Sequence, residues 1–515
     1  MGILHSLMIG FSHVFMPFDL FVLLIGLTIG MAVSIMPGLG LVMGVVLALP
    51  FTYKMAIEPS IILLTAIYFA GTYGGCFTAI LYRIPGEPMD VPLLWDGYSM
   101  SRRGQPAKAL GWALFAALIG GLVSSAVMVA LAAPLSAIAL KFDSPDYFAA
   151  AFFGLSTVVS LAGKSMVKSL ISLCVGLLVA TVGVDSIYGA DRFTFGVPIL
   201  RDGVQLVEVL VGMYGLGEVF TRLGQDVRIS TGSESNLNVG TQFPSLRELL
   251  QIKITLFRST VLGTLLGIVP GAGATITSFI SYGVEKQYGR RKKMLGSGLP
   301  EGIVAPQIGS TASVAGHMIP LLTLGIPGSG ATAVILAAFL LHGVQPGPML
   351  LTDPASRVLV YTIFASMFAS VIGMCVLGFF WIRVVVRVLM IPQGILSAIV
   401  VMFCLVGAFA NRNNMSDVWM IVIFGILGYV FEKFKFPISP MVLGAILGPI
   451  GESSFMRSMI ASNNDWTTFF VAPIRGVLMA GAIAALLYPL LRAAYSAVRG
   501  GGRPSAQDGG TTALG

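Results

Sequence analysis

The chain has 515 residues, of which 56% are hydrophobic and only 10% are charged, and its formal net charge is +8. Soluble domains carry roughly 25% charged residues, so composition excludes a water-soluble fold for most of this sequence. The basic residues lie between apolar segments, as the positive-inside rule expects of a membrane protein, and they do not indicate nucleic-acid binding.

Long apolar runs predict helices that cross a membrane. Segments 110–132 and 358–382 each reach the ~20 residues that a helix needs to span a bilayer, and a helix satisfies its own backbone hydrogen bonds. The alternating pattern of an outer-membrane barrel is absent from the sequence. We therefore expect an all-α polytopic integral membrane protein with about 12 transmembrane helices. The candidate spans are 19–53, 57–83, 110–132, 147–163, 166–184, 203–220, 256–284, 301–343, 357–390, 393–410, 416–431, 437–450 and 468–491.

Three motifs recur in the same order along the chain. They are PGLG at 37–40, IPG at 84–86 and QP at 105–106, then PGAG at 270–273, IPG at 326–328 and QP at 345–346. The two copies are separated by 233, 242 and 240 positions (270 minus 37, 327 minus 85 and 346 minus 106). Such internal duplication is typical of secondary transporters, in which the two copies are inverted or parallel across the membrane. We favour inverted repeats.

The longest polar run, 221–255, separates the two copies of the motifs and defines the predicted domain boundaries. The first membrane half is 1–220, the polar connecting segment is 221–255, and the second membrane half is 256–495. A Gly-rich polar tail at 496–515 is expected to be disordered.

The two Pro-Gly motifs are expected to break helices deep in the bilayer. PGAG begins about 14 residues into its apolar run, which corresponds to roughly 21 Å of helix. Proline lacks a backbone donor and glycine permits non-helical angles. A half-helix that begins at such a break directs unpaired N–H groups and a positive dipole end at the site, which suits an anion. Alternatively, the motifs only bend helices and the small residues only allow close packing.

Catalysis is not indicated by any motif in the sequence. It contains no GxxxxGK[ST] phosphate loop, no GxSxG or HExxH motif and no histidine–carboxylate cluster. The four cysteines, which have no CxxC spacing, indicate neither a disulfide framework nor a metal site; they are Cys76, Cys174, Cys375 and Cys404. We therefore predict a protein that is not an enzyme and has no cofactor.

Several stretches resemble the large permease subunit of tripartite tricarboxylate transporters. The similarity extends from about residue 20 to residue 490, and its most specific stretch is IPLLTLGIPGSGATA at 319–333. Other matching stretches are PGLGLVMGVVLALPFTY (37–53), YFAGTYGGCFTAILYRIPGEP (68–88), DGYSMSRRGQPAKALG (96–111), GIVPGAGATITSFISYGVEK (267–286), EGIVAP (301–306), FPISPMVLGAILGPIGESSFMRSM (436–459) and FFVAPI (469–474).

The resemblance implies a multi-pass permease of the bacterial cytoplasmic (inner) membrane. It implies import of a di- or tricarboxylate, coupled to a gradient of sodium ions or protons, as a symport. The implied partners are a small four-helix membrane subunit and a periplasmic solute-binding protein, besides the membrane lipid. In this arrangement the binding protein, a different chain, makes the first selection, so the sequence does not indicate which carboxylate is carried. The basic loop 286–293 is expected to face the cytoplasm.

Hydroxyl side chains beside the breaks, together with the matching motifs, define the predicted site. Hydroxyl groups can donate to a carboxylate or accept from a cation. The predicted substrate-binding residues are Pro37, Gly38, Gly40, Pro85, Gly86, Gly271, Gly273, Thr275, Thr277, Pro327, Gly328, Ser329 and Thr332. The candidates for ion coupling are Ser278, Ser310, Thr311 and His317.

Two departures from the family pattern concern ion coupling. After EGIVAP the family continues with an acidic residue and paired asparagines, whereas this chain has Gln307 and then Gly-Ser-Thr at 309–311. His317 stands where a small residue is more usual; it is a candidate proton relay, or simply a histidine hydrogen-bonded in the interior.

Two alternatives to a transporter belong to other functional classes. One is a channel-like or scaffold subunit whose selectivity lies in a partner, although a passive scaffold has no use for deep duplicated breaks. The other is an intramembrane enzyme, for which the sequence offers no catalytic residues.

Overall fold

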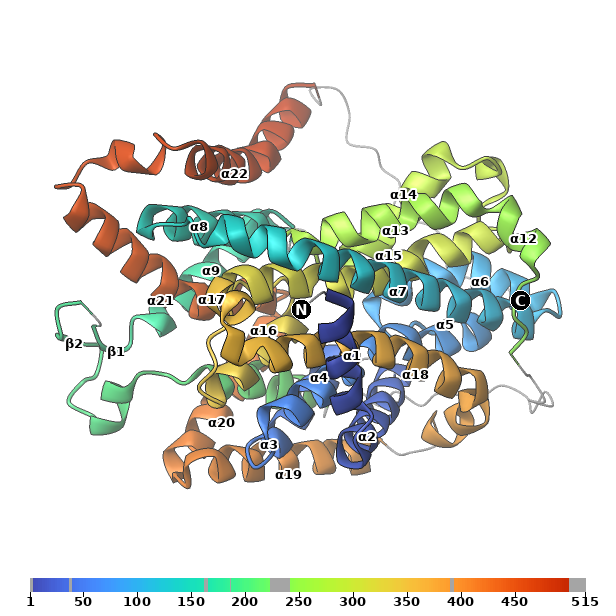
Figure 1. The fold of residues 1–515 in the computed structure, drawn as a ribbon, viewed down its shortest axis with the longest axis horizontal. Coiled ribbons are helices and arrows are strands. Elements are labelled where there is room, and N and C mark those ends of the chain that lie inside the picture. The colour runs from blue at the N-terminus through green and yellow to red at the C-terminus, as the bar shows by residue number, and fades with distance from the viewer. Residues whose placement is uncertain are drawn as a thin grey trace, which may run out of the picture.

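The computed structural model describes residues 3–36, 39–161, 165–185, 187–222, 241–389 and 393–499 (Figure 1). The side chains of 161, 222, 382–390, 393, 396, 411 and 488–499 are outside this description. The described part is almost entirely helical, so the predicted all-α membrane fold is confirmed.

The described residues before 223 contain helices of very different lengths, with one small hairpin. The helices are α1 (Ile3–Val14), α2 (Pro17–Ile35), α3 (Gly40–Thr52), α4 (Ile57–Gly74), α5 (Cys76–Tyr82), α6 (Leu93–Arg102), α7 (Pro106–Ala139), α8 (Ser144–Leu161), α9 (Met166–Ala180), α10 (Leu206–Leu210) and α11 (Gly217–Arg222). Between them lie the short turns η1 (Pro88–Asp90) and η2 (Pro198–Asp202) and the π-helical segment η3 (Val211–Leu216).

The hairpin is a feature that the sequence prediction missed. Strand β1 (Gly183–Val184) pairs antiparallel with β2 (Asp191–Arg192), whereas a helical span was predicted to continue to residue 184. Helix α9 stops at Ala180, and Gly183 then adopts φ +124°, a backbone conformation that a helix cannot contain.

The second part of the chain has a similar succession of elements. Its helices are α12 (Leu246–Gln251), α13 (Lys253–Ile268), α14 (Gly273–Tyr288), α15 (Pro300–Leu324), α16 (Gly330–Leu341), α17 (Pro348–Thr352), α18 (Arg357–Leu389), α19 (Gln393–Arg412), α20 (Met415–Lys433), α21 (Ile438–Ala461) and α22 (Pro473–Arg499). The short turns are η4 (Lys292–Met294), η5 (Pro354–Ser356) and η6 (Trp466–Phe469).

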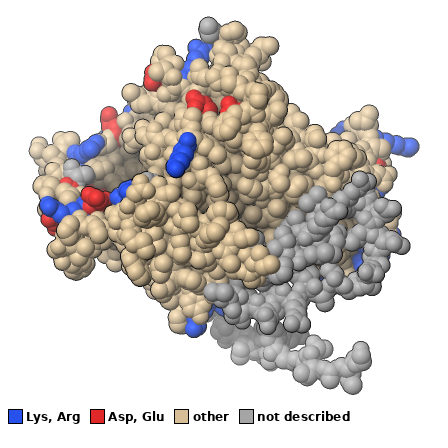
Figure 2. Space-filling model, turned by 90° about the horizontal axis from the view of Figure 1, so that it is seen from below, with Lys and Arg blue, Asp and Glu red and all other residues tan. Residues whose placement is uncertain are grey.

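Several helices are suited to a bilayer. Within the described ranges, five segments are long and apolar enough to cross it: Pro17–Ile35, Ile57–Tyr82, Pro106–Ala139, Pro354–Trp381 and Met415–Lys433. Shorter apolar helices lie beside them, so the number of about 12 crossings stays a prediction. Figure 2 shows one face on which charged side chains are few and most of the visible surface is uncharged. The chain is a multi-pass membrane protein.

Two helices at matching positions of the repeat form the buried centre of the fold. From Pro59 to Gly74 every residue of α4 is buried, and from Glu301 to Thr323 every residue of α15 is buried. Helix α2 packs on α4 as α13 packs on α15, while α18 covers α4 as α7 covers α15. Each of these helix contacts therefore has an equivalent contact in which the two halves have exchanged roles. This is what a pseudo-twofold relation between the halves requires. The domain boundaries themselves stay a prediction, because most of the polar connecting segment lies outside the described residues.

Glycines at matching positions allow the central helices to approach closely. A Cβ added at Gly30 of α2 would lie 2.5 Å from the carbonyl oxygen of Ile67, and a Cβ added at Gly267 of α13 would lie 2.7 Å from the carbonyl oxygen of Ser313. Each glycine follows another glycine four residues earlier, Gly26 or Gly263, in the small-xxx-small pattern of packed membrane helices.

We expect Gly267→Val to destabilise the protein, because its side chain would collide with the backbone of α15. Overpacking of this kind costs about 1–3 kcal/mol. Thermal unfolding of the purified protein in detergent should show a lower Tm. The matched control is Gly283→Val on α14, where an added Cβ meets nothing within 4 Å. Equal losses of stability in both variants would contradict the packing argument.

Candidate functional site

The predicted helix breaks are present at both positions. Helices α2 and α3 are separated by residues 36–39, and α13 and α14 by residues 269–272. Gly40, Gly271 and Gly273 adopt φ values of +71°, +85° and +60°. Glycine adopts these angles readily, whereas other residues are strained there. The glycines of the motifs are therefore what allows each new helix to start in a new direction.

Each break lies against the Ile-Pro-Gly turn of its own half. In the second half the N–H of Gly271 donates to the carbonyl oxygen of Gly328, at 3.0 Å. In the first half the N–H of Leu41, at the start of α3, donates to the carboxyl group of Glu87. Both contacts satisfy backbone groups that the broken helix leaves without an internal partner.

The two Ile-Pro-Gly turns are seated on the central helices in the same way. A Cβ added at Gly86 would lie 2.5 Å from the Cα of Gly75, and one added at Gly328 would lie 3.0 Å from the Cα of His317. Gly75 and His317 are themselves 242 positions apart, so the turn meets the equivalent point of each half. A side chain at either turn glycine would lift the turn from its helix.

The residues after each turn form a reciprocal cap, but the chemistry of the two caps differs. Ser329 and Thr332 cap α16: the N–H of Ser329 donates to Thr332 Oγ1 at 2.8 Å, and the N–H of Thr332 donates to Ser329 Oγ at 3.3 Å. At the equivalent positions the N–H of Glu87 donates to Asp90 Oδ2 at 2.9 Å. Hydroxyls in one half thus correspond to buried carboxyls in the other.

The broken helix of each half also touches the turn of the other half. Ser278 on α14 donates from Oγ to the carbonyl oxygen of Met89, at 2.7 Å. In the other direction, a Cβ added at Gly330 would lie 3.5 Å from a methyl carbon of Val42 on α3 and 3.0 Å from the hydroxyl oxygen of Tyr214. Tyr214 belongs to the π-helical segment η3, an element often found at functional sites. The two breaks and two turns therefore form one cluster at the joint between the halves.

A line of polar side chains crosses this joint. The Tyr68 hydroxyl on α4 lies 2.7 Å from Nδ1 of His317 and 2.9 Å from the Ser329 hydroxyl, which lies 3.2 Å from Thr332 Oγ1. Nε2 of His317 is buried, and no hydrogen-bond partner for it exists among the described residues. A buried polar atom without a partner costs free energy and indicates a place for a ligand or a water molecule.

A second polar contact joins the same two helices. Thr72 and Thr311 bring their hydroxyls to 3.2 Å, and Nε2 of Gln307 donates to the carbonyl oxygen of Thr72 at 2.9 Å. The amide oxygen of Gln307 is buried, and the described residues provide no donor for it. The polar residues that depart from the family pattern therefore face the joint between the halves.

The structure brings most of the predicted residues together and separates a few. Those at the joint or in its two turns are Gly40, Pro85, Gly86, Gly271, Gly273, Ser278, Thr311, His317, Pro327, Gly328, Ser329 and Thr332. Thr277 and Ser310 instead bond within their own helices, to Gly273 and Gln307. Thr275 is half-buried in the first turn of α14. Pro37 and Gly38 lie outside the described residues, and the binding roles of all these residues stay predictions.

Sequence reasoning missed four side chains of this cluster. Tyr68 and Tyr214 carry no sequence signal, because nothing near them in the chain indicates what they meet. Glu87 and Asp90 could have been found, since the repeat offset of 242 places them on Ser329 and Thr332. The comparison of the two halves therefore contains more information than either motif alone.

Comparison with known proteins identifies the family of the chain. The model of the tripartite tricarboxylate transporter TctA family matches residues 20–443. The chain belongs to this family. It is 34% identical over 491 residues to the uncharacterized 52.8 kDa protein in the TAR-I ttuC′ 3′ region of Agrobacterium vitis, covering 95% of this chain and 97% of that protein. It is 37% identical over 229 residues to an uncharacterized protein in the TAR-II ttuC′ 3′ region of Agrobacterium vitis, covering 44% and 94% respectively. No solved structure matches the chain.

We expect Tyr68→Phe to destabilise the folded protein, because it removes the hydroxyl that joins His317 to Ser329. Leaving buried polar groups without a partner costs about 1–3 kcal/mol. The matched control is Tyr53→Phe, since the buried Tyr53 hydroxyl has no hydrogen-bond partner among the described residues. Thermal unfolding should show a lower Tm for the first variant and little change for the second. The polar line would have no structural role if both variants unfolded like the wild type.

Proposed function

We propose that this permease subunit imports small di- or tricarboxylate anions by coupling them to a sodium or proton gradient. The observation that carries the proposal is the meeting of two broken helices and two capped turns between repeated halves. Breaking helices within the bilayer is costly, and transporters do so where the freed backbone groups line a binding site. Membership of a transporter family supports the same conclusion.

The second-half elements are suited to the anion. The start of α14 has no acidic residue in its first turn and no side-chain cap, and nothing lies within 4 Å of a Cβ added at Gly273. The start of α16 is capped by the hydroxyls of Ser329 and Thr332. Free N–H groups at a helix start, a favourable dipole and hydroxyl donors together replace the hydration of a carboxylate. The buried Nε2 of His317 lies beside this arrangement.

The first-half elements are suited to the coupling cation. The start of α3 already accommodates an acidic group, the carboxyl of Glu87, and the Asp90 carboxyl lies next to it. The buried Ser34 lies next to this turn, since a Cβ added at Gly86 would be 2.3 Å from its carbonyl oxygen, and its hydroxyl has no hydrogen-bond partner among the described residues. No basic side chain forms an ion pair with either carboxyl group among the described residues. Buried carboxyls without a cationic partner favour a bound proton or metal ion, and they disfavour a second anion at Gly40.

The remaining expectations concern the assembly. A periplasmic binding protein would deliver the anion to this chain in the bacterial inner membrane, and a small four-helix subunit would cover part of its apolar surface. Arg102, Arg103 and Lys286 line a common pocket at one end of the molecule. This supports placing both basic clusters, and with them loop 286–293, on the cytoplasmic side. The paired exchange of contacts between the halves suits inverted repeats.

Reconstitution tests the proposal directly. Proteoliposomes that contain this chain, its small subunit and its binding protein should accumulate a labelled di- or tricarboxylate when a sodium or proton gradient is imposed. Uptake should require the binding protein and should cease when the gradient is collapsed with an ionophore. Correctly assembled vesicles that fail to take up any member of a broad carboxylate panel would contradict the proposal.

The division of roles between the two caps gives a second test in the same vesicles. Glu87→Gln should weaken the dependence of uptake on the driving cation, because it removes one of the two buried carboxyls. Ser329→Ala should raise the KM for the anion about tenfold, as expected when one hydrogen bond to a charged group is lost. Ser313→Ala is the control, since that hydroxyl bonds only within its own helix. Identical kinetic changes in the Glu87 and Ser329 variants would contradict separate roles.

A further inference from the structure

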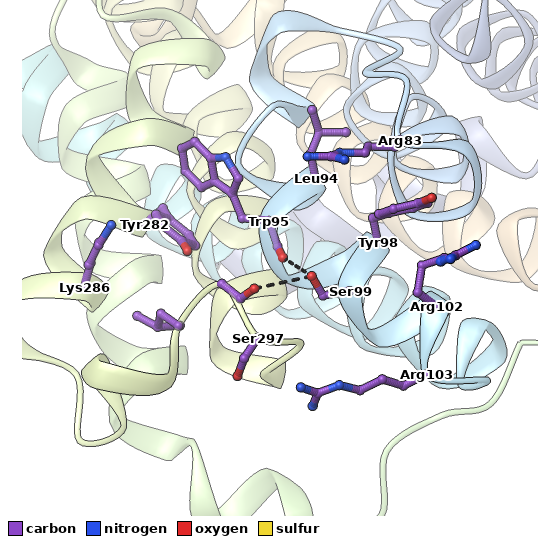
Figure 3. Close-up of a pocket in the computed structure, with 12 residues that line it drawn as sticks. Arg83, Leu94, Trp95, Tyr98, Ser99, Arg102, Arg103, Tyr282, Lys286 and Ser297 are labelled. Atoms are coloured by element: carbon purple, nitrogen blue, oxygen red, sulfur yellow. Dashed lines mark hydrogen bonds between the residues drawn. The ribbon is translucent and has the colours of Figure 1, made fainter. Parts of the chain in front are cut away.

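A large pocket lies between the two halves, away from the cluster just described. It has a volume of about 790 Å³, and its walls come from Arg83 and α6 on one side and from α14 and residues 295–297 on the other. Figure 3 shows Lys286 and Tyr282 on one wall and Tyr98, Arg102 and Arg103 on the other.

The pocket is lined by cationic side chains that form no ion pair among the described residues. Arg83, Arg102, Arg103 and Lys286 are exposed in it, and no ion pair of the described residues involves any of them. No lining residue is acidic. A concave surface that carries charges of one sign concentrates counter-ions.

The acidic residue beneath the pocket, Asp96, uses its carboxyl group in hydrogen bonds within the protein. Asp96 is buried, and its carboxylate accepts hydrogen bonds from the N–H groups of Gly296, Gly298 and Leu299, at 2.8–2.9 Å. The Tyr282 hydroxyl adds another, at 3.1 Å. These bonds attach the loop 296–299 of the second half to α6 of the first half. Within the described part of the chain, Asp96 forms no ion pair with the cationic side chains, which face the pocket.

Aromatic rings share the pocket with the cations. The centroids of Trp95 and Tyr282 lie 4.6 Å apart, and the guanidinium carbon of Arg83 lies 5.7 Å from the centroid of Tyr98. The Trp95 side chain is 40% exposed. Arginine binds carboxylate and phosphate groups in a bidentate manner, and Trp and Tyr are enriched at the membrane–water interface. A multiply charged anion with an apolar part suits these walls.

The position of the pocket connects it to the central cluster. Arg83 directly precedes the first Ile-Pro-Gly turn, and Tyr282 lies one helical turn after Ser278, which bonds to Met89. An anion that leaves the joint between the halves toward the basic end of the molecule would therefore reach these cations first.

We propose that this pocket is a binding site for an anion with two or more negative charges, built jointly by the two halves. The ligand is either a small free anion or the headgroup of an anionic phospholipid, since both present the same oxygen groups. A bound anion would hold α6 and the loop 295–299 together and so influence movement between the halves. Only that last consequence rests on the proposed transport function; anion binding itself does not.

The first arm of the test measures free anions. The purified chain, in nanodiscs of a zwitterionic phospholipid, is titrated with a tricarboxylate or with inorganic phosphate while tryptophan emission is recorded. We expect a saturable change that Trp95→Phe abolishes. The double variant Arg102→Gln/Arg103→Gln should weaken binding at least about tenfold. Arg290→Gln/Lys293→Gln, which removes two exposed cations outside the pocket, should bind like the wild type.

The second arm measures phospholipid. Native mass spectrometry should show whether phosphatidylglycerol stays bound to the wild type and to the Arg290/Lys293 control but is lost from the Arg102/Arg103 variant. Either result, for a free anion or for the phospholipid, supports the site and identifies its ligand. The proposal is overturned if neither kind of binding depends on Arg102 and Arg103 more than on the control pair.

Two checks keep the outcome interpretable. If the Arg102/Arg103 variant does not elute as the wild type in size-exclusion chromatography, Lys286→Gln on the opposite wall replaces it, and the same loss is expected. Intact anion binding in a protein that transports no carboxylate would contradict the proposed function alone. Carboxylate uptake with no anion binding in the pocket would contradict this inference alone.

Discussion

The structure depends on one constraint, which is that a helix broken inside a bilayer must find partners for its backbone groups within the protein. The chain meets the constraint twice: Gly271 bonds to Gly328, and Leu41 bonds to Glu87. Each solution needs a tight turn seated on a central helix, and each turn needs a glycine there. The repeated motifs, the burial of α4 and α15 and the contacts between the halves all follow from this requirement.

The two halves have equivalent breaks and turns, but the side chains at them differ. A carboxyl group lies at the positive end of α3, whereas the start of α14 has no acidic residue in its first turn and the start of α16 is capped by hydroxyls. A transporter that couples an anion to a cation needs both kinds of environment close together. A fold with twofold-related breaks provides the two positions, and the substitution of hydroxyls by carboxyls at one of them provides the contrast in charge.

Sequence alone predicted the features that depend on local chemistry. Apolar length predicted the membrane helices, and Pro-Gly pairs that recur at a near-constant offset predicted the breaks and the repeat. It could not predict contacts set by packing, such as that of Tyr68 with His317, which are 249 residues apart, or of Ser278 with Met89, which are 189 apart. The short hairpin after α9 was missed because its first strand, Gly183–Val184, directly extends the apolar run of that helix.

The line from His317 to Ser329 has a consequence for proton positions. The Tyr68 hydroxyl has one proton and two neighbours, so it donates to only one of them. When Ser329 donates to Tyr68, Tyr68 must donate to Nδ1, and the imidazole proton resides on Nε2. When the Ser329 hydroxyl donates to an anion instead, Tyr68 can donate to Ser329 Oγ and accept from the N–H of His317 Nδ1, so the tautomer with the proton on Nδ1 becomes compatible with the line. The position of the imidazole proton would then depend on whether an anion occupies the neighbouring cap, without any movement of the backbone.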